Sequence, residues 1–237
     1  MASRDAFGSE STLKMSKVPV VFVVDDDVSV RESLELLIAS GGWRAQTFES
    51  AQKFLDAPRV QAPNCLLLDV SMPGLNGLEL QKRVASERPD MPIIFITGYG
   101  DVPMTVQAMK AGAVEFLTKP LQAEVIIGAV AKALDCSRVA LDHEERLRAL
   151  RDQYASLSKR EREVMALVVS GLLNKQVGSE LGISVVTVKT HRGRMMQKMN
   201  ATSLPELVTM SAQLGIQSFP RVRIDRRSGT DVSGALT

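Results

Sequence analysis

Five short apolar segments alternate with amphipathic segments over the first half of the chain. Between the apolar segments, stretches such as Val28–Ser40 repeat apolar residues every three or four positions, which is typical of a helix with one buried face. Strands that alternate with helices predict a parallel sheet covered on both faces. The five predicted strands are VVFVV (20–24), Ala45–Phe48, CLLLD (65–69), PIIFIT (92–97) and Glu115–Leu117.

This alternation predicts a five-stranded parallel (βα)5 domain over residues 18–135. We expect the flavodoxin-like strand order 2-1-3-4-5, which makes the first and third strands neighbours. The polar stretch of residues 1–17 has no apolar pattern and is expected to be disordered.

Acidic side chains follow the first and third strands. Asp25, Asp26 and Asp27 come after VVFVV, and Asp69 ends the central strand just before a Pro-Gly pair. Ligands of open α/β sheets bind at the carboxyl ends of the strands, so these side chains are candidates for chemistry. Carboxylates this close repel one another unless a divalent cation lies between them, and hard oxygen ligands favour Mg²⁺.

A hydroxyl and an ammonium group follow the fourth and fifth strands. Thr97 and Lys119 could bind the remaining oxygens of a phosphoryl group, which makes Asp69 a candidate nucleophile that forms an acyl phosphate. Each residue alone has an ordinary explanation as a cap or a solvated charge. Together, at four strand ends, these explanations would require four coincidences.

A long segment without any strand signal, Leu121–Tyr154, follows the predicted sheet. Its apolar residues recur at intervals of three, four and seven, but it becomes too polar for a core after Ser137. One interpretation is a single helix that continues as a linker over residues 136–154. The other is two helices with a break near Cys136.

The last part of the chain predicts a small all-helical domain over residues 155–217. Ser158 and Glu161 form a capping-box pattern that begins its first helix. Two further segments, Asn174–Leu181 and Val185–Asn200, flank a tight turn with Gly182, which is the pattern of a helix-turn-helix. A last helix is predicted over Leu204–Gln213, and residues 218–237 are expected to be disordered.

Bulk composition limits the possible functions. The longest apolar run is far shorter than the roughly 20 residues that span a bilayer, and the N-terminus lacks an apolar signal core, so we expect a cytoplasmic protein that is not bound to a membrane. Two cysteines in a central strand and a long helix suit reduced thiols. Two histidines are too few for a structural zinc site. The basic excess of the last third predicts an anionic partner.

Four motifs carry a specific resemblance. VVDDD (23–27), LLLDVSMPG (66–74), FITGYGD (95–101) and FLTKP (116–120) resemble the receiver domain of two-component response regulators. The resemblance implies that Asp69 accepts phosphate from a sensor histidine kinase and that Lys119, before a cis Pro120, binds this phosphate. It also implies a switch pair, Thr97 and Phe116. The implied Mg²⁺ ligands are the side chains of Asp25, Asp26 and Asp69 and the carbonyl of Ser71.

The C-terminal segment 157–199 resembles the LuxR-type DNA-binding domain. The whole chain therefore resembles transcriptional regulators of the NarL/FixJ class, closest to the FixJ branch, with promoter DNA and RNA polymerase as implied partners. One departure is NATSLPEL (200–207), where many domains of the class carry an arginine. The residues expected near DNA are Asn174, Lys175, Thr187, Lys189, Thr190, His191, Arg192 and Arg194, whereas Val188 and Met195 should face inward.

Phosphorylation is expected to drive dimerisation. A hydroxyl at Thr97 that moves toward the phosphate would leave space for Phe116 to rotate inward, and this would reshape the neighbouring surface. That surface includes helix 102–111, with Val102, Pro103, Val106, Met109 and Lys110.

Two other functions remain open at this point. A Mg²⁺-dependent phosphatase also uses an aspartyl phosphate, but enzymes of the haloacid dehalogenase kind place a second aspartate two residues after the nucleophile, where this chain has Ser71. The second alternative is an adaptor whose helical tail binds a protein. The basic excess and the segment TVKTHRGR argue against the adaptor.

Overall fold

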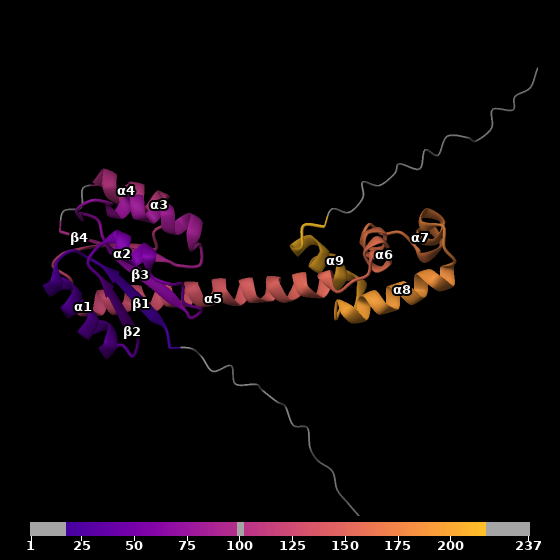
Figure 1. Cartoon of the computed structure of the whole chain (residues 1–237), viewed down its shortest axis with the longest axis horizontal. Coiled ribbons are helices and arrows are strands. Elements are labelled where there is room, and N and C mark those ends of the chain that lie inside the picture. Colours follow the sequence, from indigo (N-terminus) through magenta and orange to yellow (C-terminus); the bar gives the residue numbers. More distant parts are fainter. Residues whose placement is uncertain (1–17, 99–101, 217–237) are drawn as a thin grey trace, which may run out of the picture. The chain divides into compact units, whose positions relative to one another are not determined.

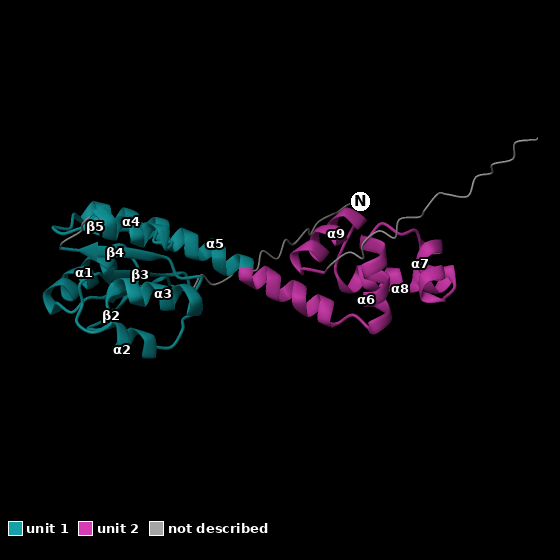
Figure 2. Ribbon diagram, turned by 90° about the horizontal axis from the view of Figure 1, so that it is seen from above, with its two compact units in different colours: residues 1–143 teal, residues 144–237 magenta. Residues whose placement is uncertain are grey.

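The computed structural model describes residues 18–98 and 102–216. The chain divides into two compact units, residues 1–143 and residues 144–237 (Figure 2). The segments 1–17 and 218–237, for which the sequence predicted disorder, lie outside the described residues.

The first unit contains a five-stranded parallel sheet with the order β2-β1-β3-β4-β5, which confirms the predicted topology (Figure 1). The three inner strands form because uninterrupted apolar runs can be buried on both faces of a sheet. The strands are β1 (Val20–Val24), β2 (Arg44–Phe48), β3 (Asn64–Asp69), β4 (Ile93–Thr97) and β5 (Glu115–Thr118).

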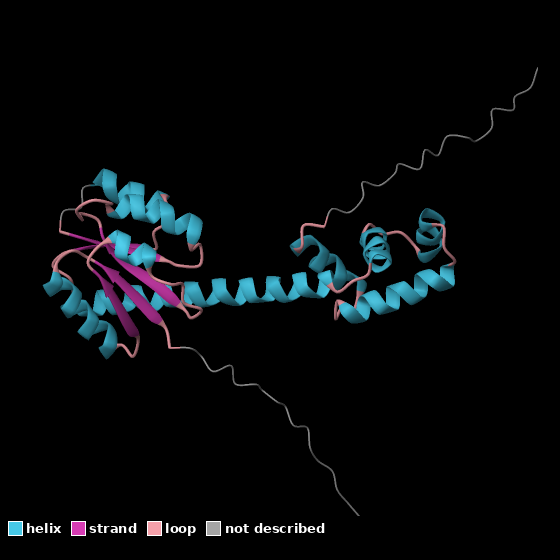
Figure 3. Cartoon of the chain, in the orientation of Figure 1, coloured by secondary structure: helices cyan, strands magenta, loops and turns pink. Residues whose placement is uncertain are grey.

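Helices connect these strands and cover both faces of the sheet (Figure 3). Several begin at side-chain caps that the sequence supplies: Asp27 caps the first, Ser50 the second, and Asn76 forms a capping box with Glu79 in the third. The helices are α1 (Val28–Ser40), α2 (Ala51–Asp56), α3 (Gly77–Glu87), α4 (Val102–Lys110) and α5 (Ala123–Ala155).

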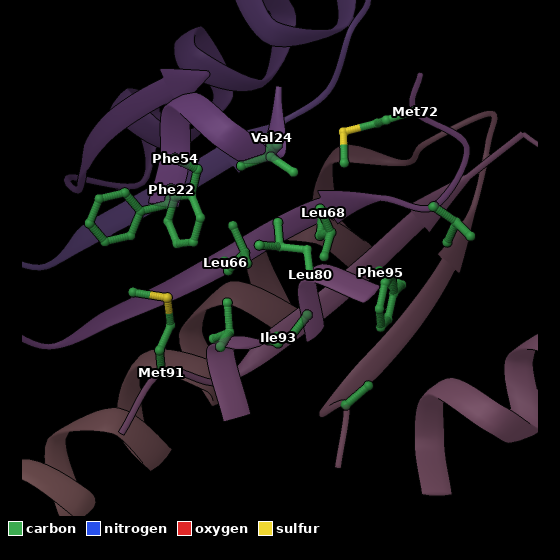
Figure 4. Packing of buried hydrophobic residues seen from close by; sticks show 14 of the residues in the cluster. Phe22, Val24, Phe54, Leu66, Leu68, Met72, Leu80, Met91, Ile93 and Phe95 are labelled. Carbon is green, nitrogen blue, oxygen red and sulfur yellow. The ribbon is translucent and has the colours of Figure 1, made fainter. Parts of the chain in front are cut away.

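Alternate residues of each strand enter two separate cores. Phe22, Leu66 and Phe95 face α2, α3 and α4, where Phe22 and Phe54 pack edge to face with ring centroids 5.5 Å apart (Figure 4). The residues between them on the strands, such as Val23 and Leu67, face α1 and α5 instead. The period of two along a strand thus builds two hydrophobic layers from one sheet.

α5 is a single helix of 33 residues, so the break near Cys136 that the sequence left open does not occur. Ser137 is buried in this helix, and its hydroxyl accepts a hydrogen bond of 3.0 Å from the backbone N–H of Asn64. This contact holds α5 to the start of β3 one residue after the expected break. Cys65 and Cys136 are both free thiols, as expected.

The second unit is helical and has its own core. Its apolar residues include Leu150 from the end of α5 together with Val164, Val177, Val188 and Leu207. Ser158 begins the first of its short helices with the predicted capping box. These helices are α6 (Lys159–Val169), α7 (Asn174–Leu181), α8 (Val185–Lys198) and α9 (Leu204–Gln213).

None of the described helices combines the length and the apolar composition that crossing a bilayer requires.

Candidate functional site

Three carboxylates meet at the carboxyl edge of the sheet. Val24 on β1 pairs with Leu68 on β3, so the residues that follow β1 lie beside Asp69. One oxygen each from Asp25, Asp26 and Asp69 lies within 4.8 Å of the others. Asp25 and Asp69 are buried, whereas Asp26 is exposed to solvent. Such a set of hard oxygen ligands, open on one side, is typical of a Mg²⁺ site.

Lys119 connects the first and third strands through its side chain. Its Nζ donates a hydrogen bond of 3.0 Å to Oδ2 of Asp25 and lies 3.5 Å from Oδ1 of Asp69. The backbone N–H of Lys119 is fixed by a 2.8 Å hydrogen bond to the carbonyl of Thr97 at the end of β4. The Lys119–Pro120 peptide is cis, as the resemblance implied. The ends of four strands therefore contribute to one site.

Burial and charge oppose each other in this site. Burial is the largest influence on Asp69 and raises its pKa; the charge of Asp25 adds to the rise, while Lys119 and the Ser71 N–H lower it in part. Burial alone would lower the pKa of Lys119, but its hydrogen bond and its attraction to Asp25, with a further contribution from Asp69, raise that pKa overall. The ammonium group therefore stays charged beside the carboxylates.

Backbone groups hold the carboxylates in place. The N–H of Ser71 donates to Oδ2 of Asp69 at 3.2 Å, and the N–H of Asp27 donates to Oδ1 of Asp25 at 2.9 Å. The guanidinium of Arg31 donates to the carbonyls of Asp25 and Asp26 at 2.7 and 3.0 Å. Sequence reasoning missed Arg31. The available signal was a basic residue near the N-terminus of a helix, where the helix dipole disfavours positive charge.

The two predicted switch residues lie on neighbouring strands. Thr97 is fully buried at the end of β4, and Phe116 on β5 is half-buried. The ring of Phe116 lies 6.1 Å from that of Phe95, centroid to centroid, at the margin of the first core. Phe116 is thus placed where its ring can pack further inward or turn toward solvent.

In the second unit, α8 buries Val188 and Met195 and exposes several polar and basic residues. Val188 and Met195 are fully buried, as predicted. Lys189, Thr190 and Arg194 are exposed. The N-terminus of α8 is capped by Ser184, whose hydroxyl accepts from the N–H of Thr187.

The other residues predicted near DNA differ in their contacts and exposure. Arg192 donates a 3.0 Å hydrogen bond to Oδ1 of Asn174 and so connects α8 with α7. The Thr187 hydroxyl is hydrogen-bonded to that of Ser184. His191 is half-buried, and its Nδ1 has no hydrogen-bond partner among the described residues. Lys175, beside Asn174 at the start of α7, is exposed.

Comparison with protein families assigns both units. Residues 21–131 match the model of the response regulator receiver domain, and residues 155–211 match that of bacterial regulatory proteins of the luxR family.

Curated relatives match over nearly their whole length. The chain is 44% identical to nodulation protein W of Bradyrhizobium diazoefficiens over 211 residues, which cover 89% of this chain and 93% of the relative. It is also 44% identical to the transcriptional regulatory protein FixJ of Azorhizobium caulinodans, with 83% of this chain and 93% of the relative covered.

Solved structures agree with this assignment. The response regulator StyR shares 45% identity and a TM-score of 0.74 over 83% of this chain and 100% of its own. Full-length FixJ from B. japonicum shares 40% identity and a TM-score of 0.50 over 84% of this chain and 98% of its own.

The family matches favour a response regulator over the two alternative functions. A phosphatase of the haloacid dehalogenase kind would need an acid at position 71, and the adaptor would not need the luxR-family unit that residues 155–211 match. The acidic cluster at the sheet edge and the exposed basic helix in the second unit agree with the family matches. The chain belongs to the DNA-binding response regulators of two-component systems, in the FixJ/NarL class.

Proposed function

We propose that a sensor histidine kinase transfers a phosphoryl group to Asp69 and that this modification activates the chain for transcription control. The observation that carries the proposal is the position of the Asp69 carboxylate, buried at the end of the central strand with Lys119 Nζ 3.5 Å away. As the phosphorus–nitrogen bond to the kinase histidine breaks, an Asp69 carboxylate oxygen forms the new phosphorus–oxygen bond.

The side chains of Asp25, Asp26 and Asp69 would hold Mg²⁺ together with the carbonyl oxygen of Ser71. Their oxygens lie within 4.8 Å of one another, and one side chain is exposed, which leaves room for water or phosphate ligands. When bound, Mg²⁺ neutralises charge on the phosphoryl oxygens. Lys119 then exchanges its contact with Asp69 for a phosphoryl oxygen, and it remains fixed by its backbone hydrogen bond to Thr97.

The hydroxyl of Thr97 donates to another phosphoryl oxygen, and the ring of Phe116 packs inward behind it. This movement changes the surface next to α4, on which Val102, Val106 and Met109 expose 76%, 44% and 42% of their surface. We propose that two phosphorylated chains dimerise through this apolar surface and so present two α8 helices to paired half-sites of promoter DNA, where they recruit RNA polymerase.

Incubation with acetyl phosphate and Mg²⁺ tests the phosphorylation site by intact mass. The wild type should gain one phosphate that hydroxylamine removes, and Asp69→Asn should gain none. Asp56→Asn, which changes an exposed carboxylate on α2, is the matched control and should behave like the wild type. A hydroxylamine-sensitive phosphate on Asp69→Asn would refute the assignment.

Sedimentation velocity tests the dimer. The full chain should change from monomer to dimer when beryllofluoride and Mg²⁺ are added, and Val106→Glu should remain monomeric because a buried charge without a partner opposes association. A monomer in the presence of beryllofluoride would exclude the dimer mechanism and leave the phosphorylation site intact.

Contacts of α8 with DNA are tested by Lys189→Ala. If Lys189 contacts a guanine, the variant should lose about 1–3 kcal/mol of binding free energy and become less specific at one base pair. If Lys189 contacts a phosphate, the variant should bind all sequences more weakly by a similar factor. Equal binding of the variant and the wild type at matched salt would contradict a role for this face.

A further inference from the structure

The outward face of α8 contains an apolar side chain that the fold does not use. Val188 and Met195 are fully buried and define the inward side of this helix. Val186 lies on the other side and exposes 74% of its surface. Its neighbours on that face, at intervals of four and seven residues, are Thr190 and Gly193. An exposed valine at the start of a helix contributes little to folding, because β-branched residues are only moderate helix formers.

The threonine hydroxyls near Val186 are already occupied. Oγ1 of Thr190 donates a 3.1 Å hydrogen bond to the carbonyl of Val186, and the hydroxyl of Thr187 is hydrogen-bonded to that of Ser184 at 2.8 Å. The hydroxyl hydrogen of Thr190 is therefore used within the helix. The face around Val186 can make apolar contacts, while the exposed Lys189 and Arg194 beside it supply positive charge.

Gly193 on α8 is not explained by the packing of the residues that the structure describes. A Cβ at this position would have no atom within 4 Å beyond its own helix and chain neighbours, so the fold has room for a side chain. Glycine inside a helix costs about 0.5–1 kcal/mol relative to alanine. The contrast with Gly178 on α7 is direct, because a Cβ there would be 2.8 Å from the carbonyl oxygen of Ile183. The packing of the unit therefore does not require a glycine at position 193.

We propose that Val186 reads the 5-methyl group of a thymine in the major groove and that Gly193 lets α8 approach the DNA closely enough for this contact. The inference rests on the proposed function of α8 and adds a specificity-determining residue to it. Thymine is the base that presents a methyl group in the major groove, and the positive charges of Lys189 and Arg194 suit the phosphates on either side. Val186 thus recognises a base by shape, without a hydrogen bond.

Replacement of thymine by uracil tests the contact, because uracil lacks only this methyl group. Duplexes are first selected from a random pool by the full chain with beryllofluoride and Mg²⁺, and each thymine is then replaced in turn. At one thymine per half-site, uracil should weaken binding of the wild type roughly fourfold, the effect of burying about one methyl group. Val186→Ala should bind the thymine and uracil duplexes equally.

Leu36→Ala on α1 is the matched control, since Leu36 also exposes 74% of its surface but lies in the first unit. This variant should keep the full effect of uracil. Gly193→Ala should bind the selected duplex more weakly than the wild type although its second unit unfolds at a higher urea concentration.

The same thymine dependence in Val186→Ala as in the wild type would overturn the inference, and so would undiminished DNA binding by Gly193→Ala. If the wild type selects no sequence at all, the proposed function of α8 fails, and this inference fails with it. Sequence-specific binding that depends on Lys189 but on no thymine methyl group would overturn the inference alone.

Discussion

At the scale of single residues, Gly77 shows how tightly the acidic site is built. A Cβ at this position would be 2.5 Å from the carbonyl oxygen of Asp69 and 3.0 Å from Cα of Val70. Both are backbone atoms, which cannot move aside as the end of a flexible side chain can. The absence of a side chain at Gly77 therefore lets the N-terminus of α3 lie against the end of β3 that carries Asp69.

We predict that Gly77→Ala destabilises the first unit by about 1–3 kcal/mol, as overpacking of a core does, and slows phosphorylation of Asp69. Trp43 is the single tryptophan of the chain and reports this unit in urea unfolding followed by fluorescence. Gly128→Ala on α5 is the control: its Cβ has open space, so it should stabilise by about 0.5–1 kcal/mol. Equal urea concentrations at the midpoint of unfolding for the two variants would contradict the prediction.

The residues that sequence analysis placed at the sheet edge share one property. Asp25, Asp69 and Lys119 directly follow or end strands, and the strand order brings such positions together. Arg31 could not be predicted in this way, because a long side chain reaches the site from a helix by its choice of rotamer. The hydrogen bond between Arg192 and Asn174 depends on how α7 and α8 cross, which the sequence pattern does not specify.

At the scale of helices, the start of α6 is joined to the end of α8 by an ion pair between buried Glu161 and exposed Lys198. Glu161 is buried, accepts a 2.8 Å hydrogen bond from the N–H of Ser158, and accepts another of 2.7 Å from Nζ of Lys198. The hydrogen bond from Lys198, followed by that from the Ser158 N–H, lowers the pKa of Glu161 to about 2. A carboxylate with a depressed pKa stabilises the fold above its unfolded pKa, and this contribution is lost as the pH falls toward 2.

We predict that Glu161→Gln destabilises the second unit by about 2 kcal/mol at pH 7, the cost of losing hydrogen bonds to a charged group. The difference from wild type should shrink as the pH falls from about 5 to about 2. Urea unfolding followed by circular dichroism measures the free energy of unfolding at each pH. Trp43 fluorescence reports the unfolding of the first unit separately, so the two transitions can be distinguished. Glu163→Gln, which removes a partner of Arg160 on the same helix, should have a much smaller effect at every pH.

The helix boundaries were predicted closely where caps or apolar runs mark them, as at Ser158 and Val28–Ser40. The continuity of α5 could not be predicted, because the segment becomes too polar for a core after Ser137. The contact that fastens α5 to β3 at this point joins Ser137 to Asn64, and these residues are far apart in sequence.

At the scale of the whole molecule, two cores use opposite ends of one helix. Ile126, Val130 and Leu134 of α5 belong to the core on one face of the sheet, and Leu150 with the half-buried Tyr154 belongs to the helical unit. Residues 143–146, between these two groups, are all exposed. This part of α5 therefore has few packing contacts to stop it from opening locally.

We predict that trypsin makes its first cut within the described residues after Arg146 or Arg148, both of which are exposed on this segment. Mass spectrometry of the early products should show one fragment that ends there and one that begins there. Trp43 fluorescence should stay native after this cut because the first core remains complete. An earlier cut inside α6, after Arg160 or Arg162, would contradict the prediction.

The arrangement of α5 also bears on how such regulators diversify by recombination. If two genes are fused within the codons for residues 143–148, both cores of the fusion protein are complete. Leu134 comes from the same parent as the sheet, and Leu150 and Tyr154 come from the same parent as the helical unit. A fusion joined at the boundary of α5 and α6 would instead separate Leu150 from Val164 and expose a core. The middle of the helix, rather than its end, is the point where a new input can be connected to an existing DNA-binding unit.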